Sequence, residues 1–569
     1  KVATSLTNVT CIGYQAGTAL TTGDRNTFLG SMAGSNVTTG EQNVALGWGS
    51  LDNATTGGNN TIVGALSAVN LTTASNNTAL GYYSLNANTT GASNTAVGTE
   101  ALKANTTANY NSAFGHHALI TNTTGYNNVG IGAFSLRYNT EGFENVGIGY
   151  SALEANTTGD FNIGIGRSAL KTQTTANHNT GIGYKAGEDI TTGQQNTAVG
   201  SQSLMNGTTA AQNVAIGAFT LETLTNGAYN VAIGNQALEE ATSSSYNVAV
   251  GYQALHLNTT GTTNTAVGTF ALEDNTTANN NSALGYNAAR NLTTGSENTA
   301  IGRSALDTST TAASCVAVGY QAMFYNTDGG ENTAVGKNAL VKNTTAHYNT
   351  AVGYHSLHEN TTGEKNTAVG SLALDANTTG EYNTAIGYDA LSNTTTPNSN
   401  TAVGYSAGLA NSTGANNTAL GSVALLSNTS ASNNTAIGKS ALQANTTGEE
   451  NTAVGALALD ANTTAHQNTA VGYESLSACT SGIRNTALGR KALKSVTTGQ
   501  QNVAVGSAAM FNNTANNNVA IGHDAMVANT SGANNTAVGA LALDANTTAS
   551  NLTAIGYNSL TNNTAANNT

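Results

Sequence analysis

The stretch Asn94–Tyr110 reads NTAVGTEALKANTTANY, and close variants of it fill the chain from end to end. The glycine of the AVG triplet recurs in steps of 17 residues from Gly13 to Gly506, and after a one-residue deletion the step resumes at Gly522. Self-similarity at a short fixed period is the signature of a repeat architecture. We therefore expect residues 1–569 to form a single continuous repeat array, without a linker or a second domain.

We number positions within the repeat from this glycine, which is position 0. Two positions are almost always large and apolar: position −1, as in Val97 and Ile131, and position +4, as in Leu102 and Leu255. Glycine, β-branched residues and an Asn-Thr-Thr turn in every unit disfavour a helix. The segment NTAVG instead indicates a short strand with alternating faces, followed by a turn.

A strand and a turn repeated at this spacing predict an all-β protein with no helix of note. We expect a β-solenoid (a β-roll) of about 33 tandem 17-residue repeats, with the large residues at −1 and +4 in its core. Burying two such side chains per coil contributes about 1.5–3 kcal/mol each. Ordering the backbone costs about 1–2 kcal/mol per residue, so we also expect ladders of stacked asparagine and association with further copies of the chain.

A 34-residue super-period overlies the repeat. Position +1 carries Tyr or Trp in every second or every fourth repeat up to Tyr388. Either each coil is one repeat long and large rings alternate with other neighbours, or each coil spans two repeats and Tyr stacks on Tyr. The pattern slips after Tyr388, since Tyr405 follows one repeat later. That slip favours one repeat per coil, in which all coils are equivalent.

Composition and charge exclude several classes of function. Only 8% of residues are charged, whereas about 25% is usual for a globular enzyme. The net charge of −13 comes from scattered acidic residues, and without clustered Lys and Arg we expect no nucleic-acid partner. No stretch approaches the roughly 20 apolar residues of a membrane span. The opening at Lys1, without Met, suggests a processed chain or a segment of a longer one.

Candidate catalytic and metal-binding residues do not gather in the sequence. The pair His116-His117 has no acid or Cys at ligand spacing, and Cys11, Cys315 and Cys479 occupy different repeat positions. No nucleophile elbow and no phosphate-binding glycine loop are found. We therefore expect neither enzyme activity nor a cofactor nor a metal site, and small buried thiols in place of disulfides.

A carboxylate recurs in near-copies of the sequence Leu-Asp-Ala-Asn. These copies place Asp375, Asp460 and Asp544 at equivalent positions. Carboxylates are too few per repeat for a calcium ladder. We expect a solvated turn face instead.

The repeat core resembles a known family. Asn213–Gly217 and Asn230–Gly234, both NVAIG, are similar to the head repeats of trimeric autotransporter adhesins and to related repeats of phage tail fibres. The resemblance covers every repeat but only about five of its 17 positions. It implies a left-handed parallel β-roll, often trimeric, that acts as a surface spike or fibre. The family's head repeat is shorter, and the Leu at +4 and the Asn-Thr-Thr turn are additional here.

The Asn-Thr-Thr turn also matches the Asn-x-Thr acceptor pattern for N-glycosylation. In repeats such as those of Asn53 and Asn206 the Asn lies one residue earlier, yet a Thr still follows two residues later. The alternative is plain turn and ladder chemistry, which the interrupted pattern at Asn139 favours. The possible N-glycosylation sites are Asn88, Asn105, Asn122, Asn156, Asn258, Asn275, Asn343, Asn360, Asn377, Asn445, Asn462 and Asn546.

Together these observations predict a structural subunit of an extracellular fibre or filament, a stiff repetitive rod whose partners are copies of itself and, where glycosylated, a glycan. The alternative is the shaft of a surface adhesin or phage tail fibre, with a binding tip outside this chain. In either case we expect a location outside the cell, at the cell surface or on the virion. A remote alternative is an ice-binding solenoid, suggested by rows of Thr, although the Thr-Thr pair lies at a turn and points to opposite faces.

Overall fold

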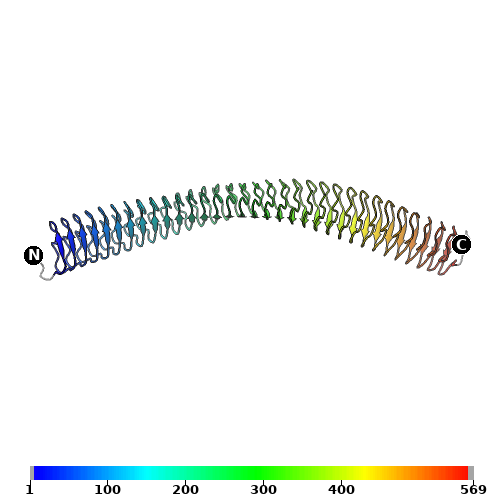
Figure 1. The fold of residues 1–569 in the computed structure, drawn as a ribbon, viewed down its shortest axis with the longest axis horizontal. Helices are drawn as coiled ribbons and strands as arrows, with labels where there is room; N and C mark the ends of the chain where they lie inside the picture. The colour runs from blue at the N-terminus through cyan, green and yellow to red at the C-terminus, as the bar shows by residue number, and fades with distance from the viewer. Residues whose placement is uncertain (1–5, 562–569) are drawn as a thin grey trace. The chain divides into compact units, whose positions relative to one another are not determined.

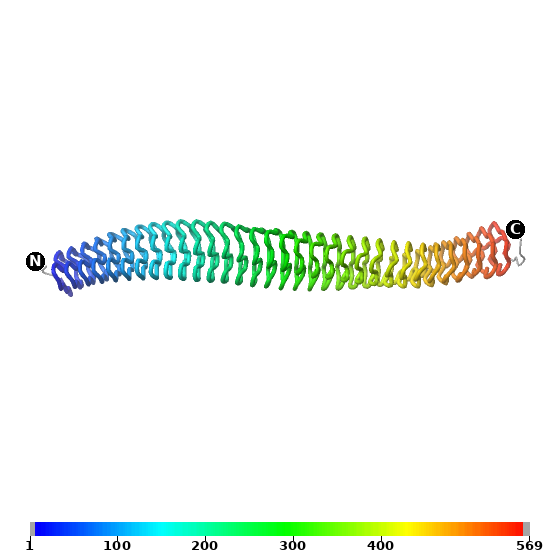
Figure 2. The backbone as a smooth tube through the Cα atoms, turned by 90° about the horizontal axis from the view of Figure 1, so that it is seen from above, coloured from blue at the N-terminus to red at the C-terminus, as the bar shows by residue number. Residues whose placement is uncertain are grey.

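The computed structural model describes residues 6–561 of the chain, which contain 33 strands of three residues each and no helix. The described chain divides into two compact units, one ending at Asn281 and one starting at Ser282. In Figures 1 and 2 each unit is a stack of similar coils, and the arrows of Figure 1 show one strand in each coil. The fold is thus the predicted β-solenoid.

The strands of the first unit are β1 Thr10–Ile12, β2 Thr27–Leu29, β3 Val44–Leu46, β4 Thr61–Val63, β5 Thr78–Leu80, β6 Thr95–Val97, β7 Ser112–Phe114, β8 Val129–Ile131, β9 Val146–Ile148, β10 Ile163–Ile165, β11 Thr180–Ile182, β12 Thr197–Val199, β13 Val214–Ile216, β14 Val231–Ile233, β15 Val248–Val250 and β16 Thr265–Val267.

The strands of the second unit are β17 Ser282–Leu284, β18 Thr299–Ile301, β19 Val316–Val318, β20 Thr333–Val335, β21 Thr350–Val352, β22 Thr367–Val369, β23 Thr384–Ile386, β24 Thr401–Val403, β25 Thr418–Leu420, β26 Thr435–Ile437, β27 Thr452–Val454, β28 Thr469–Val471, β29 Thr486–Leu488, β30 Val503–Val505, β31 Val519–Ile521, β32 Thr536–Val538 and β33 Thr553–Ile555.

Within each unit every strand pairs in parallel with the next, and the register fixes the length of a coil. Thr10 lies opposite Thr27 and Thr333 lies opposite Thr350, so paired residues are one repeat apart. Only at the deletion is the offset one residue shorter, where Val503 lies opposite Val519. Each coil therefore comprises a single repeat, and the alternative of two repeats per coil is wrong.

The super-period instead describes a row of alternating side chains at position +1. In the second unit the Arg303 guanidinium lies 5.7 Å from the ring centre of Tyr286 and 6.0 Å from that of Tyr320. The Lys337 ammonium lies 5.9 Å from the Tyr320 ring and 5.8 Å from the Tyr354 ring. Rings and cations thus alternate along this stretch, an arrangement that cation–π attraction stabilises.

The core of each coil is narrower than the sequence suggested. Ala96 at −2, Ala101 at +3 and Leu102 at +4 are fully buried. The prediction that position −1 lies in the core is wrong: Ile131 is 39% exposed, and Val97 is half-buried. Successive strand residues point to opposite faces, so a buried −2 turns −3 and −1 outward.

Alanine takes the inward position in most strands because the large residue at +4 leaves little room beside it; Phe28 and Ile62 are buried there, in coils whose +4 residue is Gly34 or Ala68. At Gly147, also a −2 position, an added Cβ would lie only 2.8 Å from Ser135 Oγ and 3.2 Å from Leu136 Cγ. The pleat therefore leaves the β-branched residues on the outside. A shift of one residue exchanges the two faces of a strand. The sequence predicted position −1 in the core, and the structure has position −2 there.

The backbone of each coil bends through left-handed residues that axial hydrogen bonds hold in place. Glu100, Leu102 and Tyr110 have φ of 57°, 52° and 61°, a conformation that costs about 1–2 kcal/mol for a non-glycine residue. Their amides donate to carbonyls of neighbouring coils, at 2.9, 3.0 and 3.2 Å. Position 0 needs glycine outright, because a Cβ on Gly98 (φ 134°) would overlap the carbonyl oxygen of Gly115. A coil is therefore stable only in a stack.

Candidate functional site

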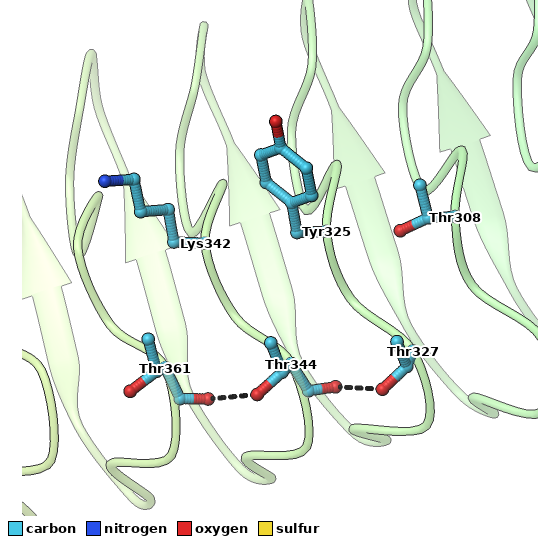
Figure 3. A pocket seen from close by; sticks show the side chains of 6 residues that line it. All are labelled: Thr308, Tyr325, Thr327, Lys342, Thr344 and Thr361. Atoms are coloured by element: carbon cyan, nitrogen blue, oxygen red, sulfur yellow. Dashed lines mark hydrogen bonds between the residues drawn. The ribbon is translucent and has the colours of Figure 1, made fainter.

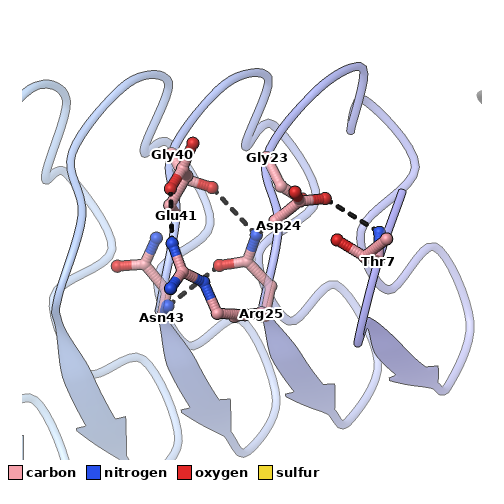
Figure 4. A network of polar contacts seen from close by, with 8 residues as sticks. Thr7, Gly23, Asp24, Arg25, Gly40, Glu41 and Asn43 are labelled. Atoms are coloured by element: carbon pink, nitrogen blue, oxygen red, sulfur yellow. Dashed lines mark hydrogen bonds and ion pairs between the residues drawn. The ribbon is translucent and has the colours of Figure 1, made fainter. Parts of the chain in front are cut away.

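Two rows of buried asparagine run along the inside of the solenoid. The first is position −4. The backbone amide of Asn43 donates to Asn26 Oδ1 at 2.9 Å, and Asn26 Nδ2 donates to the carbonyl of Gly40 at 2.8 Å (Figure 4). Each Asn of this row thus joins its coil to the next through both ends of its amide, and the predicted asparagine ladder is present.

The surface of the same coils carries a second polar network (Figure 4). Asp24 Oδ1 accepts a hydrogen bond from the Thr7 amide at 2.8 Å, which lowers the pKa of this exposed carboxyl. Arg25 pairs with Glu41 at 3.1 Å. Exposed pairs of this kind contribute little to stability, so this network does not mark a functional site.

The second buried row, position +7, contains all twelve predicted glycosylation sites. In this row Asn105 Nδ2 donates to Asn88 Oδ1 at 3.0 Å and to the carbonyl of Ala108 at 3.1 Å. All twelve asparagines are at most 1% exposed. A glycan on Nδ2 would replace one of these donated hydrogens and would need space that the interior lacks. Glycosylation stays a prediction, and the folded geometry disfavours it at these twelve positions.

The Thr at +8 forms a third ladder. Thr327 Oγ1 donates to the carbonyl of Thr344 at 2.9 Å, and Thr344 Oγ1 to that of Thr361 at 3.1 Å (Figure 3). The shallow groove above this ladder is lined by Thr308, Tyr325 and Lys342. Because the hydroxyl hydrogens at +8 are used along the axis, the +8 threonines are poor candidates for an ice-binding face.

The outer face of the strands is uncharged in both units. In the 33 described strands position −3 is always Thr, Ser, Val or Ile, and position −1 is always Val, Ile, Leu or Phe. Many of the −1 side chains are well exposed, for example Leu420 at 44% and Ile386 at 40%. An exposed row of apolar side chains is a candidate interaction surface.

Positions +2 and +5 form neighbouring rows on another face, and here the stacking brings chemistry together. His117 Nε2 lies 3.2 Å from Glu100, and His256 Nε2 lies 2.8 Å from Glu239; each pair is separated by one repeat. The interpretation that His116-His117 lacks an acidic partner is therefore wrong, although Glu100 is shared with Lys103 at 2.9 Å.

The same rows hold one group of three potential metal ligands among residues 6–561. His355, His358 and Asp375 each offer a ligand atom, and these atoms all lie within 4.8 Å of one another. Sequence analysis missed this group, although the signal was present: His355 and His358 occupy +2 and +5 of one repeat, and Asp375 follows His358 by one period.

The three recurring aspartates are less solvated than predicted. Asp375, Asp460 and Asp544 are half-buried, and Oδ1 of each makes no hydrogen bond within the described structure. Desolvation raises the pKa of Asp375 and of Asp460. The expectation of a fully solvated turn face is therefore wrong.

Each cysteine replaces the usual residue of its row, and the three cysteines lie in three different rows. Cys11 occupies −2, Cys315 occupies −4 and Cys479 occupies +7, and all three are free thiols. Cys315 Sγ lies 3.3 Å from the Gly329 carbonyl, where an Asn of this row would donate. Burial raises the pKa of Cys315 and of Cys479 to about 11, so both remain protonated at neutral pH and are inert.

Comparison with known proteins adds no assignment: no protein-family model matches the chain, and no curated protein matches it. No helix in the described residues is long and apolar enough to cross a bilayer.

Proposed function

We propose that the chain is a structural subunit of an extracellular fibre or filament that associates with copies of itself through the outer strand face. The observation that carries the proposal is the uncharged, exposed row at −3 and −1, repeated in every described strand. A side-by-side contact between chains would cover this row, and area removed from water contributes about 25 cal/mol per Å². The trimer that the resemblance implies is one form that such a contact would take.

The interior supports the same proposal. Backbone amides, two asparagine rows and the +8 threonines all bond along the axis to neighbouring coils. Nothing in this scheme depends on the number of coils, because each coil contacts only its neighbours. Repetition of this kind suits a mechanical element, a hydrated rod, rather than a protein with a single binding or catalytic site.

Introducing charge on the outer face tests the proposal. We expect the triple variant Val369→Lys, Val403→Lys and Ile437→Lys to shift the midpoint of self-association, measured by sedimentation, at least tenfold to higher concentration. The matched control changes exposed turn residues of the same coils, as Thr379→Lys, Thr413→Lys and Thr447→Lys, and should associate like the unmodified chain. Equal association of both variants would rule out the outer face as the contact.

A second candidate, the shaft of an adhesin or phage tail fibre, draws on the variable +2 and +5 rows. Their side chains change from coil to coil, as in the pairs Lys103–Glu100 and Lys494–Glu474, whereas a pure polymer needs no such variation. Electron microscopy of the native material separates the two. Long uniform filaments support a structural polymer, and short rods of fixed length that end in a knob support a shaft.

One observation still favours the ice-binding alternative, and it concerns the outer strand face instead of the turn. The ten strands β20 to β29 all begin with Thr, so position −3 presents an unbroken row of ten outward threonines. Ice binding requires thermal hysteresis of the purified chain. Its absence, together with filaments in the microscope, would leave the fibre as the function.

A further inference from the structure

We propose that His355, His358 and Asp375 form a binding site for a divalent transition-metal ion of the Zn²⁺, Co²⁺, Ni²⁺ or Cu²⁺ type. Imidazole suits these ions, and two His with one carboxylate is a ligand set known from zinc sites that keep an open position. The site is independent of the fibre proposal, since it lies on the +2 and +5 rows and not on the strand face.

The positions of the ligands follow from the solenoid geometry. His355 and His358 lie in one coil with their rings stacked, at 4.4 Å between ring centres and 9° between planes. Asp375 lies in the next coil at the same position as His358. Ligands of one tetrahedral Zn²⁺ are about 3.3 Å apart. The three ligand atoms lie within 4.8 Å of one another. Because a metal lies in the plane of each imidazole that binds it, one ring must rotate out of the stack before both can bind the same ion.

The hydrogen bonds of the two rings leave different nitrogens for a metal. His358 Nδ1 lies 2.9 Å from Glu359 Oε1, which leaves Nε2 as the ligand nitrogen. His355 Nε2 accepts from Asn338 Nδ2 at 3.2 Å, so the ring hydrogen lies on Nδ1. Metal binding through Nδ1 requires the Asn338 amide to turn, so that its buried, unpartnered Oδ1 accepts from Nε2–H. A carboxylate on the far nitrogen of a metal-binding His is the usual outer-shell arrangement, since it fixes the tautomer and raises the basicity of the ligand. Glu359 is in the place to do this for His358.

The ligand positions are partly desolvated. Desolvation, with the charges of His358 and Lys337 nearby, lowers the pKa of His355. Burial raises the pKa of Asp375, which a bound cation would reverse. The nearby charges are mixed: Lys342 is paired with Glu359 at 2.7 Å, and Asp389 adds a further carboxylate.

Two other coil pairs of the same unit provide matched controls. Asp460 and Asp544 occupy the position of Asp375 and also leave Oδ1 without a partner. The coil before Asp460 carries Ser440 and Gln443 where the two His lie, and the coil before Asp544 carries Asp524 and Val527. What sets Asp375 apart is therefore the His pair and not the carboxylate.

Calorimetric titration of the full chain, without a histidine tag, with Zn²⁺ at pH 7.5 tests the site. We expect one tight site per chain in the unmodified protein. His358→Gln and Asp375→Asn should each weaken it at least tenfold, and Glu359→Gln should weaken it roughly tenfold through the orientation of His358. Asp460→Asn and His466→Gln should leave the affinity unchanged, and circular dichroism checks that each variant is folded.

Cobalt provides the readout that separates a three-ligand site from loose binding to carboxylates. Co²⁺ held by two imidazoles and a carboxylate in a near-tetrahedral site gives intense visible absorption, which should be lost in His355→Gln and His358→Gln and kept in His466→Gln. No Zn²⁺ binding by the unmodified chain, or equal binding by it and His358→Gln, would overturn the proposal. Failure of the strand-face variants to alter association would leave this result untouched.

Discussion

Two stretches of the first unit have the same backbone but different interiors. From Asn88 to Asn156 every +7 residue is Asn, and each amide bonds to the one before it. From Ile190 to Ala241 the +7 residues are Ile, Gly, Leu and Ala, all fully buried. The −4 asparagine row and the one-repeat register continue through both stretches. The two stretches therefore share the −4 row and differ at +7, where one is amide and the other apolar.

At the junction between the two stretches, a residue of a third kind connects the amide ladder to the apolar row. Gln173 follows Asn156 in the +7 row, and its Nε2 donates to the Ala176 carbonyl at 3.0 Å. Its Oε1 accepts from Asn179 Nδ2 of the −4 row at 3.0 Å. The longer side chain thus ends the ladder with its oxygen satisfied, and the next coil can place the apolar Ile190 there. A buried amide needs a partner, and Gln supplies the connection.

In some coils an apolar +7 residue fills the space of a small +4 residue. Gly187 is followed by Ile190 and Ala68 by Leu71, whereas Leu221 and Leu224 of one coil are both large. An added Cβ on Gly187 would lie 2.9 Å from Ile190 Cδ1, which shows that the Ile fills the space of the missing Leu. The interior is close-packed, so in these coils the side chains at +4 and +7 fill one shared volume.

The largest effect is expected from placing an asparagine alone in the apolar stretch. In Leu224→Asn the amide oxygen would lie between Gly207 and Ala241, with no amide above or below it. Loss of apolar burial and an unsatisfied amide together should destabilise the adjacent coils by about 4 kcal/mol. Hydrogen exchange of residues 200–250 measures this loss of protection. Leu224→Met is the control and should cost less than about 1.5 kcal/mol; similar protection in both would mean that the stretch tolerates amides.

The reverse exchange in the ladder should cost somewhat less. Asn122→Leu removes the donor to Asn105 Oδ1 and the acceptor of Asn139 Nδ2. Asn105 Oδ1 is then buried without a partner, and Asn139 Nδ2 keeps only its bond to the Gly142 carbonyl, at a cost of about 2–3 kcal/mol. Thr124→Ala, an exposed change in the same turn, should alter exchange by less than about 0.5 kcal/mol. Full protection in Asn122→Leu would show that the ladder is dispensable.

Most of the scaffold was predictable from the sequence, and the reason is the period. Gly at 0, the buried Leu102 and the asparagine rows all follow from one 17-residue unit. The outward orientation of Val97 did not follow from the sequence. Alternation shows that neighbouring strand residues face opposite sides, but not which of the two sides is the core. The narrow core that determines this is seen only in the structure. The metal ligands were within reach, since one period after His358 comes Asp375, but only after the coil length was known.

A stabilising change is expected where the ladder is interrupted in the second unit. Asn377 Oδ1 is buried without a partner, because the next +7 residue is Thr394 and not Asn. In Thr394→Asn the new amide would donate to Asn377 Oδ1 and join this run to Asn411. We expect a gain of about 1–2 kcal/mol, measured as slower hydrogen exchange in residues 375–415. No gain would imply that the loss of the bond from Thr394 Oγ1 to the Asn411 carbonyl, now 3.0 Å, outweighs the new one.

The smallest effect is expected where the two stretches do not differ, at position +8. Thr106 Oγ1 donates to the Thr123 carbonyl at 3.2 Å in the amide ladder, and Thr225 Oγ1 donates to the Thr242 carbonyl at 2.9 Å in the apolar stretch. Each carbonyl also accepts the backbone amide of the same Thr, at 3.2 Å and 2.9 Å, so removing the hydroxyl leaves no carbonyl unpaired. Thr106→Val and Thr225→Val should therefore each cost about 0.5 kcal/mol, with equal changes in hydrogen exchange. A much larger cost in the apolar stretch would show that the +8 hydroxyl bonds there compensate for the missing amide ladder. The stability of the turn would then depend on which residues occupy +7.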